Sequence, residues 1–365
     1  MDQLPSPTLS YSSLNPAGAA RPSRRAPSWP AAVVVWGLFL ICCGLPLAWM
    51  LVALISSPHA IHALQPVGFH LRLLGRTLAW NAGVAAIATL LALPVAIVLG
   101  NGRGVALGVL AFLLPAALLL PSIVYAYGWM QVLRVGNVFP MPGTAGDVAR
   151  CVWTLGTWLW PIPAGVIGLA LRRLDADLQQ QAMLDGGYWR VVGRQLAAPA
   201  AASLAIVAIL AMQEFAVYEP TGISVVATEV RTVFETGEVG LNTGAIASVQ
   251  SGTGFTLSPS DQAHNAAAAL VTALPLLTTI AVLGIAALFV LRHHVDAPDA
   301  IDVGPRPRVL QPGMGVTLLA FGVVGVALVL PIATMIGSVH RAFDLERVWR
   351  TFSPPVLGTV QISPR

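Results

Sequence analysis

The chain has 365 residues, of which 56% are hydrophobic and only 10% are charged, and its formal net charge is +4. An ordinary soluble domain is about 25% charged, so this composition excludes a water-soluble fold of this size. All 20 basic residues are arginines, which excludes a Walker A loop, because that loop needs a lysine to reach the nucleotide phosphates. We therefore expect an all-α polytopic membrane protein without a P-loop of its own.

Seven uncharged runs are long enough for the roughly 20 residues that a spanning helix needs. They cover residues 31–55, 77–100, 104–133, 151–171, 195–213, 265–291 and 309–339. Backbone groups in lipid must be paired within their own segment, so each run is expected to be a helix. Residues 1–30 are rich in proline and serine and predict a disordered tail, which Arg21, Arg24 and Arg25 would hold in the cytoplasm.

Residues 292–312 contain the proline, glycine and charges of a cytoplasmic linker between domains. The sequence LPLAWMLVALI from Leu45 matches LPIATMIGSVH from Leu330 in register, which favours an internal repeat over coincidence. We expect six spans in residues 31–291 to form a first transmembrane permease domain, and residues 313–365 to begin a second, incomplete repeat. The uncharged run 351–364 is too short to span a membrane, which suggests a truncated fused protein.

The segment between the fourth and fifth predicted spans reads LQQQAMLDGGYWRVVGRQLAAP over residues 178–199. Its apolar residues fall on one face at helical spacing, and two glycines interrupt that pattern, which predicts a helix, a turn and a second helix. The residues of this face are Leu178, Ala182, Leu184, Trp189 and Val192, and the glycines are Gly186 and Gly187. Pro199 is expected to open the next helix, where its missing N–H is not needed.

This loop resembles the signature loop of ABC importer permeases, of the iron(III), thiamine and polyamine branch. Gly186 supplies the glycine of that motif, Leu196 follows after nine residues, and Pro199 takes the place of its proline. An acidic residue before the glycine and aromatic and basic residues after it resemble the iron(III)-type branch, whereas glutamines replace Glu and Ala at the start. The resemblance implies an ATPase-coupling loop made by Gln180, Gln181, Ala182, Asp185, Gly186, Trp189, Arg190, Leu196 and Pro199.

The same resemblance implies a permease subunit that is not itself an enzyme and holds no cofactor. Its partners would be ATP-binding cassette ATPase subunits and a periplasmic substrate-binding protein, in the lipid bilayer of a bacterial inner (plasma) membrane, with no nucleic acid. Ferric iron is the expected cargo, with thiamine, polyamine and phosphonate as open alternatives. An ion-gradient-driven secondary transporter is the alternative mechanism, although the seven runs lack the acids or histidines that such proteins use.

Three residues are candidates for the substrate path or a gate. Glu214 directly follows the fifth predicted span, where an ionisable group is a functional candidate, with a solvated interfacial carboxylate as the alternative. Pro121 and Tyr125 lie in a Leu-Pro-rich segment that resembles the third span of the same family. Prolines within spans are expected to kink them, and they are Pro115, Pro121, Pro161 and Pro163.

The outer segment after Glu214 carries several charges, which either contact a substrate-delivering protein or belong to a solvated loop. These residues are Glu219, Glu229, Arg231, Glu235 and Glu238. The three cysteines and seven histidines form no ligand set, so no metal site is expected.

Overall fold

The computed structural model describes residues 33–34, 37–38, 40–56, 67–135, 144–174, 176–236, 259–295, 312–338 and 350. Every regular element within these ranges is a helix, as the composition predicts. The chain divides into two units, Met1–Val52 and Ala53–Arg365. The predicted disordered tail, the centre of the predicted linker and most of the predicted second repeat after Ser338 lie outside the described residues.

The second unit contains four uninterrupted segments that are long and apolar enough to cross a membrane. They are α3 (Val67–Asn101), α9 (Tyr188–Gln213), α12 (Pro259–Val295) and the succession of α13 (Met314–Val324), the π-helix η5 (Gly325–Val329) and α14 (Leu330–Ser338). Two further pairs of helices are long and apolar enough to cross a membrane only when the two helices of a pair are counted as one span. The protein therefore has four to six candidate spans in the part of the chain that the structure describes.

The two pairs differ in how sharply they bend. Helices α4 (Gly104–Leu119) and α5 (Ser122–Val135) meet at 100°, and α6 (Thr144–Leu159) and α7 (Pro161–Arg173) meet at 41°. The run 104–133, which is expected as a span, is therefore two helices that count as one span only if that span is broken, because the chain turns at Leu120 and Pro121. The first predicted span is described only in part, as the π-helix η1 (Leu40–Gly44) and α2 (Leu45–Ser56).

Kinks are predicted at four prolines, and at two of them the structure has a break between helices. Pro121 follows the end of α4, and Pro161 begins α7 at the second bend. Pro115 lies inside α4, which continues to Leu119, and Pro163 lies in the first turn of α7. Proline lacks the N–H of a regular helix, but its surroundings decide whether the helix ends there.

Helix α3 is central to the second unit, because it packs against α6, α7, α9 and α13. Small residues bring these backbones close together. A Cβ atom added at Gly168 of α7 would lie 2.9 Å from the Cβ of Leu99 in α3, and one at Gly156 of α6 would lie 2.7 Å from Ile87. Without a hydrophobic driving force in lipid, such close packing is a main source of helix association.

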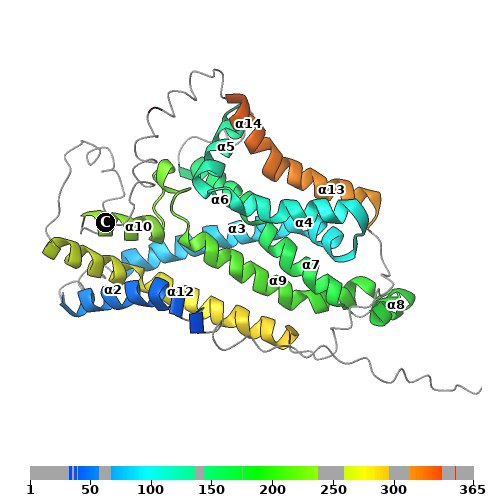
Figure 1. Cartoon of the computed structure of the whole chain (residues 1–365), viewed down its shortest axis with the longest axis horizontal. Helices are drawn as coiled ribbons and strands as arrows, with labels where there is room; N and C mark the ends of the chain where they lie inside the picture. Colours follow the sequence, from blue (N-terminus) through cyan, green and yellow to red (C-terminus); the bar gives the residue numbers. More distant parts are fainter. Residues whose placement is uncertain are drawn as a thin grey trace, which may run out of the picture. The chain divides into compact units, whose positions relative to one another are not determined.

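The loop helices lie at opposite ends of this bundle. Helix α8 (Ala176–Leu184) lies at the end where α9 begins, and α10 (Val226–Thr236) lies at the end where α9 finishes. Figure 1 shows the two ends, with α8 and α10 far apart along α9. Helix α10 packs mainly against α12, so the segment after the fifth predicted span is in part a folded element.

Candidate functional site

The predicted coupling loop forms a helix, a turn and a second helix, as expected from its glycines. Helix α8 ends at Leu184, and Gly186 has φ +67°, a left-handed conformation that glycine adopts without strain. The Gly187 N–H donates to the Ala182 carbonyl at 2.9 Å, and the Gly186 N–H donates to the Met183 carbonyl at 3.2 Å. This pair of bonds is a Schellman motif, which satisfies the last carbonyls of α8 and fixes the direction of the turn.

Two apolar residues of the loop face solvent, contrary to the predicted common face. Ala182 and Val192 are buried, but Leu184 is 87% exposed and Trp189 is 73% exposed. Ala182 and Leu184 are two positions apart on α8, and helical residues at that spacing do not share a face, so Leu184 points away from the buried side. The remaining polar residues of the predicted coupling set are exposed, and they are Gln180, Gln181, Asp185 and Arg190.

Pro199 does not open a helix, so that prediction is wrong. It lies buried inside α9, which runs from Tyr188 to Gln213. Leu196 is partly buried and packs with Val192 against residues of α3 and α7. The second helix of the loop and the fifth predicted span are therefore one continuous helix. A membrane helix tolerates an interior proline because neighbouring helices can satisfy the backbone groups that the proline leaves unpaired.

The break between α4 and α5 is stabilised by side chains from distant segments. The indole N–H of Trp158 donates to the Leu120 carbonyl at 3.1 Å, which satisfies a carbonyl at the break. Tyr125 is buried, and its hydroxyl lies 2.7 Å from the Thr157 carbonyl and also contacts the Ala327 carbonyl of η5. A phenol has one proton, so it donates to one of these carbonyls at a time.

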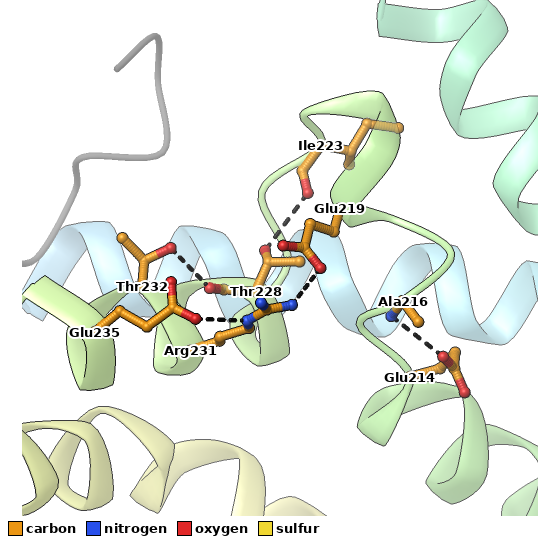
Figure 2. Close-up of polar contacts among 8 residues, drawn as sticks. All are labelled: Glu214, Ala216, Glu219, Ile223, Thr228, Arg231, Thr232 and Glu235. Carbon is orange, nitrogen blue, oxygen red and sulfur yellow. Dashed lines mark hydrogen bonds and ion pairs between the residues drawn. The ribbon is translucent and has the colours of Figure 1, made fainter. Parts of the chain in front are cut away.

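Glu214 lies at the end of α9, next to the same break. Its Oε1 accepts a 2.9 Å hydrogen bond from the Ser122 hydroxyl and a 3.2 Å bond from the Ala216 N–H, the second of which is drawn in Figure 2. The structure thus brings Glu214 to the residue that follows Pro121. Tyr125 belongs to the same helix α5, but its hydroxyl is directed at α6 and η5 rather than at Glu214.

An apolar pocket adjoins this junction. Its walls come from α5, from the middle of α6 and from residues 216–221. Among the lining residues are Tyr127, Met130, Arg150, Cys151 and Thr221. The Arg150 guanidinium forms a 2.8 Å ion pair with the Asp147 carboxylate, so the positive charge of this lining residue is offset.

The segment after Glu214 is ordered by one arginine (Figure 2). Arg231 binds Glu219 and donates from Nε to Glu235 at 2.9 Å, and its guanidinium lies 5.2 Å from the centre of the Phe215 ring. These hydrogen bonds, with that to Glu235 first, raise the pKa of Arg231, which stays charged. Residues 215–236 therefore form a folded segment, of which Glu219, Arg231 and Glu235 make the exposed side.

Glu229 lies on the opposite side of α10 and is fully buried, so its prediction as a solvated loop residue is wrong. The burial follows from the apolar spacing of Val226, Val230 and Val233, which gives α10 one face toward α3 and α12. This spacing was present in the sequence and is the signal that was missed. Glu238 lies outside the described residues.

In comparisons with known proteins, no protein-family model, curated protein or solved structure matches the chain significantly. The geometry of the two ends of α9 is therefore the basis for assigning a function.

Proposed function

We propose that the chain is the membrane-spanning permease subunit of an ATP-driven ABC importer, coupled to ATPase subunits through residues 178–199. The observation that carries this proposal is the Schellman-closed turn at Gly186, which presents Leu184 and Trp189 at one end of the helix bundle. An exposed leucine and tryptophan flanking a rigid turn are suited to a hydrophobic groove on a partner protein.

The continuity of α9 suggests how ATP binding reaches the substrate path. The helix begins at Tyr188, beside the turn, and ends at Gln213, directly before Glu214. A force applied at the turn is transmitted along one helix to the Ser122–Glu214 contact at the break between α4 and α5. Alternating access then requires α9 to shift relative to α4 and α5, which opens the path on one side and closes it on the other.

The charges favour a cytoplasmic location for the coupling loop. Its end of the bundle carries four exposed or partly exposed arginines, which are Arg172, Arg173, Arg190 and Arg194. The positive-inside rule then places α8 in the cytoplasm and α10 outside. With that orientation the N-terminus is cytoplasmic, the membrane is the bacterial inner membrane, and a periplasmic binding protein delivers the substrate to the α10 end.

Ferric iron is the proposed cargo, on the basis of the loop's resemblance to the iron(III)-type branch, and thiamine, polyamine and phosphonate are the alternatives. ATP hydrolysis takes place in the partner subunits, and the chain itself carries no cofactor in this proposal. The ligand of a binding protein that stimulates transport by this chain identifies the cargo directly.

The coupling surface is tested by co-purification with the ATPase subunits. A Leu184→Glu, Trp189→Glu double variant is expected to lose at least ten-fold in ATPase binding, because both side chains are exposed and their replacement removes apolar contact area without disturbing buried packing. The matched control is Phe234→Glu, since Phe234 is 51% exposed but lies on α10 at the other end of the bundle. Full transport and ATPase coupling in a Gly186→Arg variant contradicts the assignment.

The second candidate is an ion-gradient-driven transporter, and two buried ionisable residues favour it. His70 of α3 is 5% exposed and Glu229 of α10 is 0% exposed. In that mechanism Glu229→Gln abolishes transport, whereas Glu235→Gln, at an exposed position of the same helix, has no effect. In the ABC mechanism both variants transport with ATP, and an uncoupler of the ion gradient does not stop them.

A further inference from the structure

A polar pocket lies where the end of α3 meets the starts of α4 and α13. Among the residues that line it are Asn101, Arg103, Ala106 and Thr317, and its volume is about 160 Å³. This is far more space than one water molecule needs. Figure 1 shows that α13 begins at the same end of the bundle as α8. The pocket is therefore separate from the contact at Glu214, which follows the opposite end of α9.

Two helices contribute their first turns to this pocket. Ala106 is the third residue of α4 and Thr317 is the fourth residue of α13. The first N–H groups of a helix have no acceptor within that helix. The N-cap residues are Arg103 and Gly313, and neither caps its helix through a side chain. Two positive helix ends thus meet at one place, which favours an anion there.

The side chain of Asn101 gives independent evidence for a ligand. Asn101 is the last residue of α3 and is 8% exposed, so it is more than nine-tenths buried. Its amide lines the pocket but has no hydrogen-bond partner among the described residues. Buried polar side chains in native proteins are nearly always hydrogen-bonded, so this amide indicates a ligand that the pocket accepts.

Arg103 gives the pocket a positive charge. Its side chain is exposed and forms no ion pair within the part of the chain that the structure describes, and none of the lining residues is acidic. Arg172 adds a second positive charge near the end of α3, where its Nε donates to the Leu99 carbonyl at 2.6 Å. The planar guanidinium group matches the paired oxygens of a phosphate group, which it binds through two hydrogen bonds.

The surface beside the pocket is apolar. Val105 of α4 and Met314 and Leu318 of α13 are all exposed. Helix α13 begins a candidate span, and α4 belongs to one of the two bent pairs. In a membrane, acyl chains can therefore contact these residues while a headgroup reaches the pocket. A soluble ion would make no use of this apolar surface.

We infer that the pocket binds a phosphate group, held by the Arg103 guanidinium, the Asn101 amide and the first N–H groups of α4 and α13. The phosphate belongs to an anionic phospholipid or to a soluble phosphate ion, and the exposed apolar residues favour the lipid. Basic pockets between membrane helices bind phospholipid headgroups through the same chemistry. The inference goes beyond the proposed transport function and does not rest on it, because it uses only contacts within residues 98–106 and 312–318.

Binding to the delipidated full chain in detergent, without ATPase subunits, tests the inference. The probes are dioctanoyl phosphatidylglycerol, inorganic phosphate and dioctanoylglycerol, which has the same acyl chains without the phosphate. A ligand of the folded state raises the unfolding temperature with its concentration, and this dependence gives the dissociation constant. We expect phosphatidylglycerol to bind at least about ten-fold more tightly than dioctanoylglycerol, because only the former makes charge-assisted hydrogen bonds.

Two arginine variants separate the pocket from the general charge of this end of the bundle. Arg103→Gln is expected to weaken phosphatidylglycerol binding about ten-fold, because it removes charge-assisted hydrogen bonds. Its side chain is exposed, so the fold is expected to stay intact. Arg173→Gln is the matched control, since Arg173 is exposed in the last turn of α7 and does not line the pocket. It should change binding by less than about two-fold.

Asn101→Leu provides a second readout that a purely structural role would not give. The substitution is expected to weaken phosphatidylglycerol binding several-fold without lowering the unfolding temperature of the ligand-free protein, because the buried amide loses no hydrogen bond within the described residues. An amide that only supports the fold would instead lower that temperature and leave the dissociation constant unchanged, which contradicts its role in the site.

The remaining outcomes identify the source of the phosphate or overturn the inference. Inorganic phosphate that binds as tightly as phosphatidylglycerol, with the same order of variants, assigns the site to a soluble phosphate, and much weaker binding assigns it to the lipid. Equal losses in Arg103→Gln and Arg173→Gln overturn the inference, as does equal binding of dioctanoylglycerol or no binding of either phosphate probe. ATPase binding by the Leu184 and Trp189 variant bears on none of these results, so the two proposals fail separately.

Discussion

Ser122 donates a 2.9 Å hydrogen bond to Glu214 and so joins two segments that are 92 residues apart in the sequence. Ser122 is the first residue of α5, immediately after the break at Pro121, and Glu214 immediately follows α9. The same carboxylate oxygen accepts from the Ala216 N–H at 3.2 Å. Glu214 therefore holds the end of α9 against the start of α5, and Ala216, whose N–H it accepts, lines the apolar pocket.

Substitutions at this contact separate a structural role of Glu214 from a role in transport. Ser122→Ala is expected to lower the free energy of unfolding by about 1 kcal/mol, and Glu214→Leu by about 1–3 kcal/mol, because it removes both hydrogen bonds. Glu214→Gln keeps an acceptor oxygen and should unfold at the wild-type temperature. If Glu214 is a gate, Glu214→Gln nevertheless transports several-fold more slowly in proteoliposomes with the ATPase. Wild-type transport by Glu214→Leu rules out the gate.

The two neighbouring glycines of the proposed coupling loop provide a matched pair of variants. Gly186 has φ +67° and Gly187 has φ −99°, and neither has an atom within 4 Å of an added Cβ. Gly186→Ala should therefore cost about 1–2 kcal/mol from backbone strain alone, whereas Gly187→Ala should cost less than about 0.5 kcal/mol. Gly186→Asn is expected to recover part of the loss, because asparagine tolerates the left-handed region.

The measurements for this pair are thermal unfolding and stimulation of the partner's ATPase activity. Both should follow the order wild type, Gly187→Ala, Gly186→Asn, Gly186→Ala. Equal coupling in Gly186→Ala and Gly187→Ala would show that the direction of the turn does not matter to the partner.

The close contact between α3 and α7 predicts a second contrast between glycines of one helix. A Cβ at Gly168 would lie 2.9 Å from Leu99 Cβ, but one at Gly165 would lie at an ordinary 3.9 Å from Leu114. Gly168→Ala should therefore destabilise the protein by about 1–3 kcal/mol through overpacking, and Gly165→Ala should be neutral or stabilising because alanine favours helix. Thermal unfolding in detergent measures both, and equal shifts would contradict this packing.

The helices of the apolar runs and the turn at Gly186 were predictable from the sequence because they depend on local properties. Long uncharged runs give helices in lipid, and a Gly-Gly pair inside a helical pattern gives a turn. The break at Pro121 was not predictable, because Pro115 has the same local chemistry and lies inside a continuous helix. The difference is the hydrogen bond from Trp158 to the Leu120 carbonyl, a contact between residues 38 positions apart.

Two errors in the candidate site have separate causes. Pro199 was expected to start a helix, yet neighbouring helices support it inside α9. Leu184 was expected on a common apolar face with Ala182, yet it is exposed and Ala182 is buried. The two residues are two positions apart on α8, and side chains at that spacing do not share a face of a helix.

Tyr218 predicts how the stability of the segment between α9 and α10 depends on alkaline pH. Burial raises the pKa of its phenol above the ordinary value of 10.0, and the negative charge of Glu214 adds to the shift. The ring stacks on Trp80, and its hydroxyl lies 3.4 Å from the Asn81 side-chain oxygen, which is a weak hydrogen bond. Tyr218→Phe should thus cost less than about 1 kcal/mol near neutral pH.

The sign of the pH effect follows from the raised pKa. Below about pH 10 the phenol keeps its proton in both states, so Tyr218 adds no pH dependence there. Above about pH 10 the unfolded chain loses the proton while the folded protein keeps it, so this contribution to stability falls by up to about 1.4 kcal/mol per pH unit until the folded pKa is reached. Thermal unfolding between about pH 8 and 11.5 should therefore fall more steeply for wild type than for Tyr218→Phe. Parallel curves would mean that the Tyr218 phenol ionises equally in both states and that the packing against Trp80 does not shield it.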